Sequence, residues 1–174
     1  MTDQAMWNYT GDRRPEFAVE PGPGQESVWD YPRPPALDAS NETVEVRSGD
    51  RLIARTTRAL RLRETASPPT YYLPPNDVAA DVLVEIAGSS VCEWKGAARY
   101  WALADDPAVP VGWSYPRPRA RYKGLADYYA FYPARLECFV DGHRVEPQPG
   151  RFYGGWITPR VVGPFKGEPG TGHW

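Results

Sequence analysis

The residues most able to do chemistry gather in one ten-residue segment, Cys92 to Trp101. It contains one of the two cysteines, one of the three lysines and three large aromatic residues. Cys92 carries a thiol, Glu93 a carboxylate and Lys95 an ammonium group. A thiolate is a nucleophile, and a neighbouring cation lowers a thiol pKa. The segment therefore predicts a binding site or a nucleophilic centre, while the simpler interpretation makes Cys92 a small buried hydrophobic residue closing a strand.

The three lysines share one local pattern. Lys95, Lys123 and Lys166 each stand between an aromatic residue and a glycine. The ring can flank the alkyl stem, and glycine permits close backbone approach. For Lys123 and Lys166 the pattern favours turns with solvated tips. Lys95, beside Cys92 and Glu93, is the strongest candidate for a polar anchor.

Composition limits the classes of function. The chain has 174 residues, which suits a single domain. Its net charge of −2 provides no overall field to attract nucleic acid, and no apolar run approaches the ~20 residues that span a bilayer. Two cysteines are fewer than a secreted disulfide scaffold normally has. We therefore expect reduced cysteines, a soluble cytoplasmic protein, and neither nucleic acid nor membrane as a partner; the oligomeric state stays open.

Proline content predicts a mainly β fold. The 20 prolines leave little room for long helices. One helix is predicted from Asp77 to Ile86, after Pro74-Pro75 and before Gly88. A second short helical stretch is predicted over residues 124–130.

Alternating patterns predict the strands. Residues 44–47 and 52–54 form one predicted hairpin, and residues 135–145 form another around Asp141-Gly142. In Ala59 to Glu64 the leucines are expected to point inward. The same parity points Glu64 inward, where a carboxylate needs a partner. An arginine ion pair and a role in a site are equally consistent with that position.

A short repeat suggests related surroundings for two tryptophans. Residues 29–34 and 113–118 both read Trp-x-Tyr-Pro-Arg-Pro. Duplication of a half-domain and local convergence both explain it. In either case we expect Trp29 and Trp113 to occupy comparable positions on two sheets.

Several motifs, in order from residue 26 to residue 174, together identify a family. They are Glu26 to Pro35, Arg63 to Thr65, Pro68 to Pro74, Asp77-Val78, Cys92 to Trp101, Trp113 to Tyr115, Ala130 to Tyr132 and Phe152 to Thr158. The chain thereby resembles proteins catalogued as domain of unknown function 427. Many members have Cys-Pro-Tyr-Lys-Gly where this chain has Cys92 to Gly96, so it resembles a subgroup with an added carboxylate.

The resemblance implies a fold but no activity. It implies a β-tent-like architecture: two small antiparallel sheets, one or two short helices and a Pro/Gly-rich C-terminal extension. Relatives of that shape include zinc-bearing methionine sulfoxide reductases and thalidomide-binding domains. A nucleotidyltransferase label sometimes attached to the family has no supporting motif here. We predict an N-terminal arm over 1–25, a domain over 26–150 and a packed extension over 151–174.

Metal and cofactor signals are weak. Cys92, Cys138, His143 and His173 lack the paired spacing of zinc knuckles, so we predict no metal. Phosphate-loop, dinucleotide and nucleophile-elbow motifs are absent, and we predict no cofactor. The alternating charges of residues 117–123 are expected to form a solvated face of an extended segment.

Three functions remain. The favoured one is a small-molecule binding module with an aromatic-lined pocket between the sheets. Its expected walls are Tyr72, Trp94, Trp113 and Tyr115, and its polar anchors Glu64 and Lys95. The first alternative is a small enzyme in which Cys92 is the nucleophile and Glu64 the acid or base, with Lys95 beside them. The second is a structural or partner-binding domain.

Overall fold

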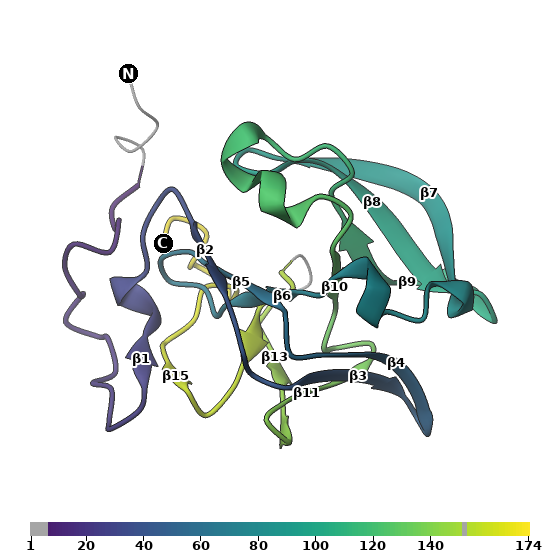
Figure 1. The fold of residues 1–174 in the computed structure, drawn as a ribbon. Helices are drawn as coiled ribbons and strands as arrows, with labels where there is room; N and C mark the ends of the chain where they lie inside the picture. The colour runs from purple at the N-terminus through teal and green to yellow at the C-terminus, as the bar shows by residue number, and fades with distance from the viewer. Residues whose placement is uncertain (1–6, 151–152) are drawn as a thin grey trace.

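Short strands and 3₁₀ helices make up a computed structural model of the chain (Figure 1). The structure describes residues 7–150 and 153–174, and within them the strands form five small sheets, none closed into a barrel. The prediction of a mainly β fold of small antiparallel sheets is confirmed. Phe152 of the family motif and residues 1–6 of the predicted arm lie outside the described residues.

The first four-stranded sheet has the order β12-β11-β3-β4 and is antiparallel throughout. Its strands are β3 (Val44–Ser48), β4 (Arg51–Thr56), β11 (Glu137–Val140) and β12 (His143–Arg144). Both predicted hairpins are present. Their turns use Gly49 and Gly142 at φ of 59° and 80°, a left-handed conformation that glycine adopts without a Cβ penalty.

The second four-stranded sheet has the order β10-β9-β8-β7 and is also antiparallel. Its strands are β7 (Leu83–Cys92), β8 (Gly96–Leu103), β9 (Asp106–Ser114) and β10 (Tyr129–Phe131). The β7–β8 turn carries Lys95, so the strongest sequence candidate lies at the end of a long hairpin.

The remaining strands form three smaller sheets. The three-stranded sheet contains β2 (Ala36–Ala39), β5 (Leu60–Arg63) and β6 (Thr70–Tyr72). The two-stranded sheets pair β1 (Glu26–Ser27) with β15 (Val161–Val162), and β13 (Glu146–Pro147) with β14 (Trp156–Ile157). A bridge between Leu73 and Tyr129 connects the end of β6 to β10.

The prediction of a helix from Asp77 to Ile86 is wrong. Two short 3₁₀ helices occupy its first part, η3 (Pro75–Asp77) and η4 (Ala80–Val82), and strand β7 occupies the rest. The Asp77 carboxylate does not cap a helix because it accepts a hydrogen bond from the Thr56 hydroxyl at 2.7 Å. Strand β7 pairs with β8 along nearly its whole length, and this tertiary pairing outweighs the local helix signal.

The second predicted helix is displaced. The 3₁₀ helix η5 (Ala120–Leu125) ends where the predicted stretch over 124–130 begins, and β10 occupies its end. The residues expected to form an extended basic stripe over 117–123 therefore turn into η5. Lys123 lies exposed there, as predicted.

The tryptophan repeat does not produce equivalent positions. Trp113 lies in strand β9, whereas Trp29 lies in the 3₁₀ helix η2 (Val28–Asp30). The expected placement of both on sheets is therefore wrong. Trp29 is fully buried and makes edge contacts with Tyr9 and Trp174, each with ring centroids 5.1 Å apart. It anchors segments from both ends of the described chain.

Strand β5 is covered on both faces. Leu62 is buried and Leu60 half-buried, in accord with the inward parity, but Arg61 between them is also buried. Arg61 forms an ion pair with Glu26 at 2.8 Å. Alternation correctly predicted the strand, but it could not reveal a charged residue buried on the opposite face.

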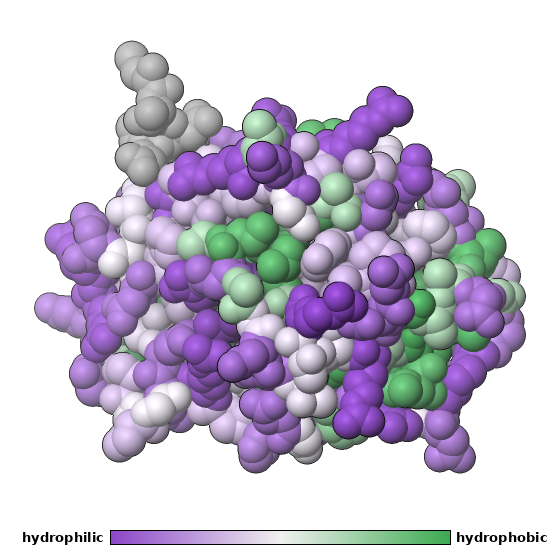
Figure 2. Space-filling model, in the orientation of Figure 1, coloured by the Kyte–Doolittle hydropathy of each residue, from purple (hydrophilic) through white to green (hydrophobic). Residues whose placement is uncertain are grey.

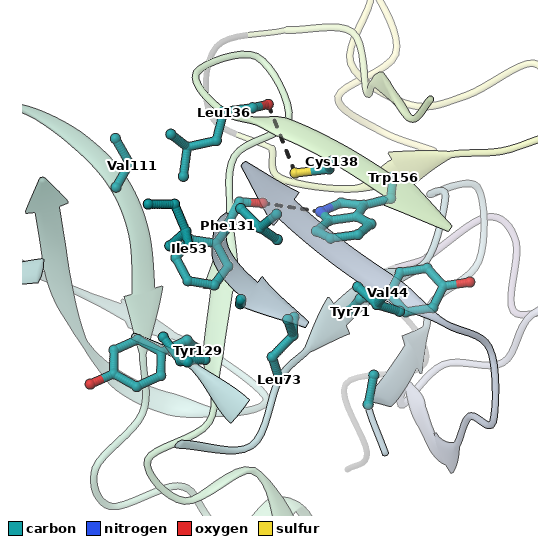
Figure 3. Close-up of a cluster of buried hydrophobic side chains, with 14 of the residues drawn as sticks. Val44, Ile53, Tyr71, Leu73, Val111, Tyr129, Phe131, Leu136, Cys138 and Trp156 are labelled. Carbon is teal, nitrogen blue, oxygen red and sulfur yellow. Dashed lines mark hydrogen bonds between the residues drawn. The ribbon is translucent and has the colours of Figure 1, made fainter. Parts of the chain in front are cut away.

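The main core lies against the first sheet and extends to β10 (Figure 3). Val44, Ile53, Phe131 and Trp156 are fully buried in it. The indole N–H of Trp156 donates to the main-chain oxygen of Phe131 at 3.0 Å. Trp156 lies in the predicted C-terminal extension, so that segment contributes to the core; the domain boundaries at 25 and 150 stay predictions.

Candidate functional site

A cavity of about 210 Å³ opens where strands β5, β6, β8 and β9 meet the C-terminal segment. Polar and aromatic side chains from distant parts of the sequence line it. They include Glu64, Lys95, Trp113, Tyr115, Tyr132 and Lys166. Four of the six residues predicted to bind a ligand are in this set, and their role as ligand contacts stays a prediction.

The β7–β8 turn places Lys95. Gly96 has a φ of 107°, and a Cβ there would approach the main-chain oxygen of Arg117 to 3.3 Å. The Arg119 N–H donates to the Lys95 main-chain oxygen at 3.0 Å. The glycine that follows Lys95 thus permits both the left-handed backbone and the close packing of the turn against residues 117–119.

The ammonium group of Lys95 is held among aromatic rings. Its Nζ donates to the Tyr72 hydroxyl at 3.3 Å and lies 5.4 Å from the centroid of the Tyr115 ring. Burial lowers the pKa of Lys95, but Tyr115, Cys92 and Glu64 raise it by more, so its pKa lies above the ordinary value. Burial raises the pKa of Tyr72 and of Tyr115 above the ordinary tyrosine value, which already lies well above neutrality. At neutral pH the wall therefore presents the Lys95 cation and the neutral Tyr115 hydroxyl, with the neutral Tyr72 hydroxyl buried behind them.

Glu64 both lines the cavity and forms an ion pair. Its Oε2 lies 3.4 Å from Nε of Arg33, whose side chain is fully buried. Arg33 also donates to the main-chain oxygens of Thr65 and Trp174, at 3.1 and 2.7 Å. The two interpretations of Glu64, structural ion pair and site residue, are thus compatible, because about a quarter of the side chain stays exposed.

Lys166 is a cavity residue for which the sequence favoured a solvated turn. It is only 7% exposed, and it lines the same cavity as Lys95. Its Nζ donates to the main-chain oxygen of Trp174 at 3.3 Å and lies 4.8 Å from the Trp7 ring. Burial lowers the pKa of Lys166, and the nearby positive charge of Arg33 lowers it further. The aromatic-Lys-Gly tripeptide that it shares with Lys95 could not have identified it, because Lys123 has the same tripeptide and is exposed outside the cavity.

Aromatic packing fixes the part of the cavity wall that Trp113 and Tyr132 form. The rings of Trp113 and Tyr132 have centroids 4.7 Å apart. Gly154 packs directly on Trp113, since a Cβ at that position would lie 2.2 Å from the indole ring. The Gly154 position therefore requires the absence of a side chain, which explains one glycine of the Tyr-Gly-Gly-Trp motif.

Three residues proposed from sequence lie beside the cavity and do not line it. Tyr72 is fully buried behind the wall, and its hydroxyl accepts the hydrogen bond from Lys95. Trp94 and Cys92 are half-buried and pack against the same aromatic cluster. Cys92 is a free thiol. Its role as a nucleophile and the role of Trp94 as a wall both stay predictions.

The possible metal ligands are dispersed. Among residues 7–150 and 153–174, no group of three or more His, Cys, Asp and Glu side chains is close enough to hold a metal ion. Cys138 is buried in the main core, and His143 is exposed on β12.

The fold and cavity define a mainly β protein of small antiparallel sheets with a polar, aromatic-walled hollow beside the β7–β8 hairpin. The sequence profile of the family described as Domain of unknown function (DUF427) matches residues 36–142, and the chain belongs to this family. No curated protein matches the sequence. In the described part of the chain, no helix is both long and apolar enough to cross a membrane.

The family match covers only part of the cavity. Glu64, Lys95, Trp113 and Tyr115 lie within residues 36–142, whereas Lys166 lies after them. The cavity thus combines residues of the matched region with residues of the C-terminal segment. Assignment to the Cys-Glu-Trp-Lys-Gly subgroup stays a prediction.

Proposed function

We propose that the protein is a small-molecule binding module whose ligand occupies the cavity beside Lys95. The main support for the proposal is that separate segments of the chain contribute side chains to one cavity. The loop after β5 contributes Glu64, the β7–β8 turn contributes Lys95, and strand β9 contributes Trp113. Aromatic walls with a few convergent polar groups are typical of ligand sites.

The size of the cavity favours a small ligand. Drug-sized ligands occupy roughly 300 to 1,000 Å³, and this cavity measures about 210 Å³. A single ring with one or two substituents suits that volume. The ring would lie against Trp113 and Tyr132, and its polar groups would reach the ammonium of Lys95.

A binding screen with a blocking variant tests the proposal. One-ring compounds of positive, neutral and negative charge are titrated while tryptophan fluorescence and the melting temperature are followed. Ser67 lines the cavity, so Ser67→Phe should fill it and abolish the response. Ser89 is exposed outside the cavity, so Ser89→Phe is the matched control and should bind as wild type does. Absence of any response in the wild type, or equal binding by both variants, would refute the proposal.

The enzyme alternative has less support from the geometry. It requires Cys92 to meet a substrate, and the residues lining the cavity do not include Cys92. Rapid, selective alkylation of Cys92 at neutral pH, prevented by a cavity ligand, would favour the enzyme over the binding module.

The partner-binding alternative depends on exposed apolar side chains. Figure 2 shows a mostly hydrophilic face, with hydrophobic residues gathered at its centre and toward the side of β4, β7 and β9. Leu52, Val84 and Val109 are 41%, 37% and 39% exposed on those strands. Single exposed apolar residues are ordinary in monomeric proteins. Concentration-dependent light scattering without any ligand effect would favour this alternative.

A further inference from the structure

Strand β7 forms a long outer edge of the second four-stranded sheet. In the order β10-β9-β8-β7 it pairs only with β8, and it runs along the outer margin of the molecule (Figure 1). Within the described part of the chain, no segment other than β8 forms main-chain hydrogen bonds with residues 84–92. The main-chain groups on the outer side of this strand are therefore available to pair with another strand.

The other edges of the two four-stranded sheets are short or partly covered. β12 has two residues. The Ala79 N–H donates to the main-chain oxygen of Ile53 at 2.8 Å and so covers part of β4. Leu73 and Tyr129 exchange main-chain hydrogen bonds of 2.7 and 2.9 Å, which cover part of β10. By contrast, β7 has ten residues, and it is the edge best suited to bind a partner strand.

The side chains of β7 do little to prevent pairing. Edges that must stay unpaired usually carry lysine, proline or a bulge. Residues 83–92 include no proline and no basic residue, and Glu85 is their one charged residue. Val84 is 37% exposed and Val91 73% exposed, so apolar side chains reach solvent along this edge. A register shift beside Gly88 interrupts the strand, and any pairing has to accommodate this break.

We propose that β7 pairs with β7 of a second copy of this chain, antiparallel and about a two-fold axis at Gly88. Such an axis places one residue opposite itself, and residues equally distant from it face each other across the copies. An axis at Glu85 would oppose two like charges, and an axis at Ser89 would oppose Glu85 to Glu93. An axis at Gly88 avoids both and places the two breaks together where neither copy has a side chain. The facing pairs are then Val84 with Cys92, Glu85 with Val91, and Ile86 with Ser90.

Charge favours a second copy as the occupant of this edge. With Glu85 as its one charged residue, β7 offers little to attract a strongly basic segment. The net charge of −2 produces only weak repulsion between copies, and two-fold dimers are the commonest symmetric assemblies. Because Ser90 lies on β7 and also lines the cavity, the strand of the second copy would border the cavity. The dimer itself does not depend on a ligand.

Sedimentation velocity of the full chain tests the dimer and its interface. Concentrations from about 5 to about 500 µM are used, because pairing through one strand edge should be weak. Val91→Glu places a carboxylate opposite Glu85 at two symmetric positions, and it should raise the dimer dissociation constant about tenfold. Val91→Lys creates opposite-charge pairs instead and should dimerise at least as tightly as wild type. Val109→Glu is the matched control, because Val109 is an exposed valine on β9.

A designed disulfide tests the position of the axis. The double variant Glu85→Cys, Val91→Cys places two thiols opposite each other across the dimer, close enough to be joined. Within one copy the two positions lie roughly 20 Å apart along the strand, too far for a disulfide. Mild oxidation should therefore yield a covalent dimer on non-reducing electrophoresis. Val91→Cys alone is the control and should yield far less.

Each result supports or overturns the proposal. A wild-type protein that stays monomeric at the highest concentration would refute the dimer. A dimer that Val91→Glu weakens no more than Val109→Glu does would refute the β7 interface. A dimer whose double cysteine variant forms no more disulfide than the single variant would refute the axis at Gly88. Far-UV circular dichroism verifies that the variants fold, and the wild-type concentration series decides on the dimer whatever their behaviour.

Discussion

Replacement of Gly154 by alanine offers a direct test of the packing that forms the cavity wall. A Cβ at this position would lie 2.2 Å from one ring carbon of Trp113 and 2.7 Å from another. Ordinary carbon–carbon contacts are roughly 3.5 to 4.0 Å, so the ring and the backbone must separate by about 1.5 Å. Trp113 is 7% exposed and packs on Tyr132, which leaves it little room to shift.

The expected cost is that of overpacking a buried site, about 1 to 3 kcal/mol. The backbone of Gly154 lies outside the left-handed region, so conformational strain does not add to this cost. Gly172→Ala is the matched control, because Gly172 also lies outside that region and a Cβ there would meet no atom within 4 Å. Its effect on the free energy of unfolding should stay within about 0.5 kcal/mol.

Urea unfolding followed by tryptophan fluorescence measures both variants, and near-UV circular dichroism reports the surroundings of the Trp113 ring. We expect Gly154→Ala to lower the midpoint and alter the near-UV spectrum, whereas Gly172→Ala should change neither. Equal midpoints for the two variants would mean that Gly154 does not pack on Trp113 as described, and the account of the wall would be wrong.

Two further predictions concern titration and reactivity. Burial raises the pKa of Glu26, but hydrogen bonds from Arg61 and Tyr31 outweigh it and lower the pKa from 4.5 to about 2. Because the folded-state pKa is depressed, the stabilisation is complete above pH 4.5 and is lost as the pH falls toward 2; after allowance for partial exposure it amounts to roughly 2 kcal/mol. Glu26→Gln should remove that part of the acid sensitivity in urea unfolding at several pH values, and an unchanged pH profile would contradict the assignment. Iodoacetamide should modify half-buried Cys92 before Cys138, since burial raises the pKa of the Cys138 thiol and blocks access; peptide mapping that finds Cys138 modified first in the folded protein would overturn this order.

Features governed by neighbouring residues could be predicted from the sequence. The hairpins of β3–β4 and β11–β12 combine alternating strands with a glycine at a left-handed turn position. Their register follows from local geometry. The inward parity of Glu64 was predicted for the same reason. The family motifs and the mainly β class required no knowledge of the packing.

Features governed by distant partners could not be predicted. Residues 83–92 form a strand instead of a helix because β8 is available to pair with them along nearly their whole length. Arg61 is buried because Glu26 supplies a counter-charge from 35 residues away. Neither partner can be identified from the local pattern.

The same distinction between local and distant causes applies to the residues of the candidate site. The sequence by itself determined which residues carry chemistry and that Lys95 and Lys166 share one tripeptide. The tertiary structure alone decided that these two lysines line one cavity while Lys123 is exposed. The physical reason is that the tripeptide shapes only its own turn. The C-terminal segment lies against strand β9 and the core because Gly154 packs on Trp113 and Trp156 is buried, and these contacts place Lys166 at the cavity.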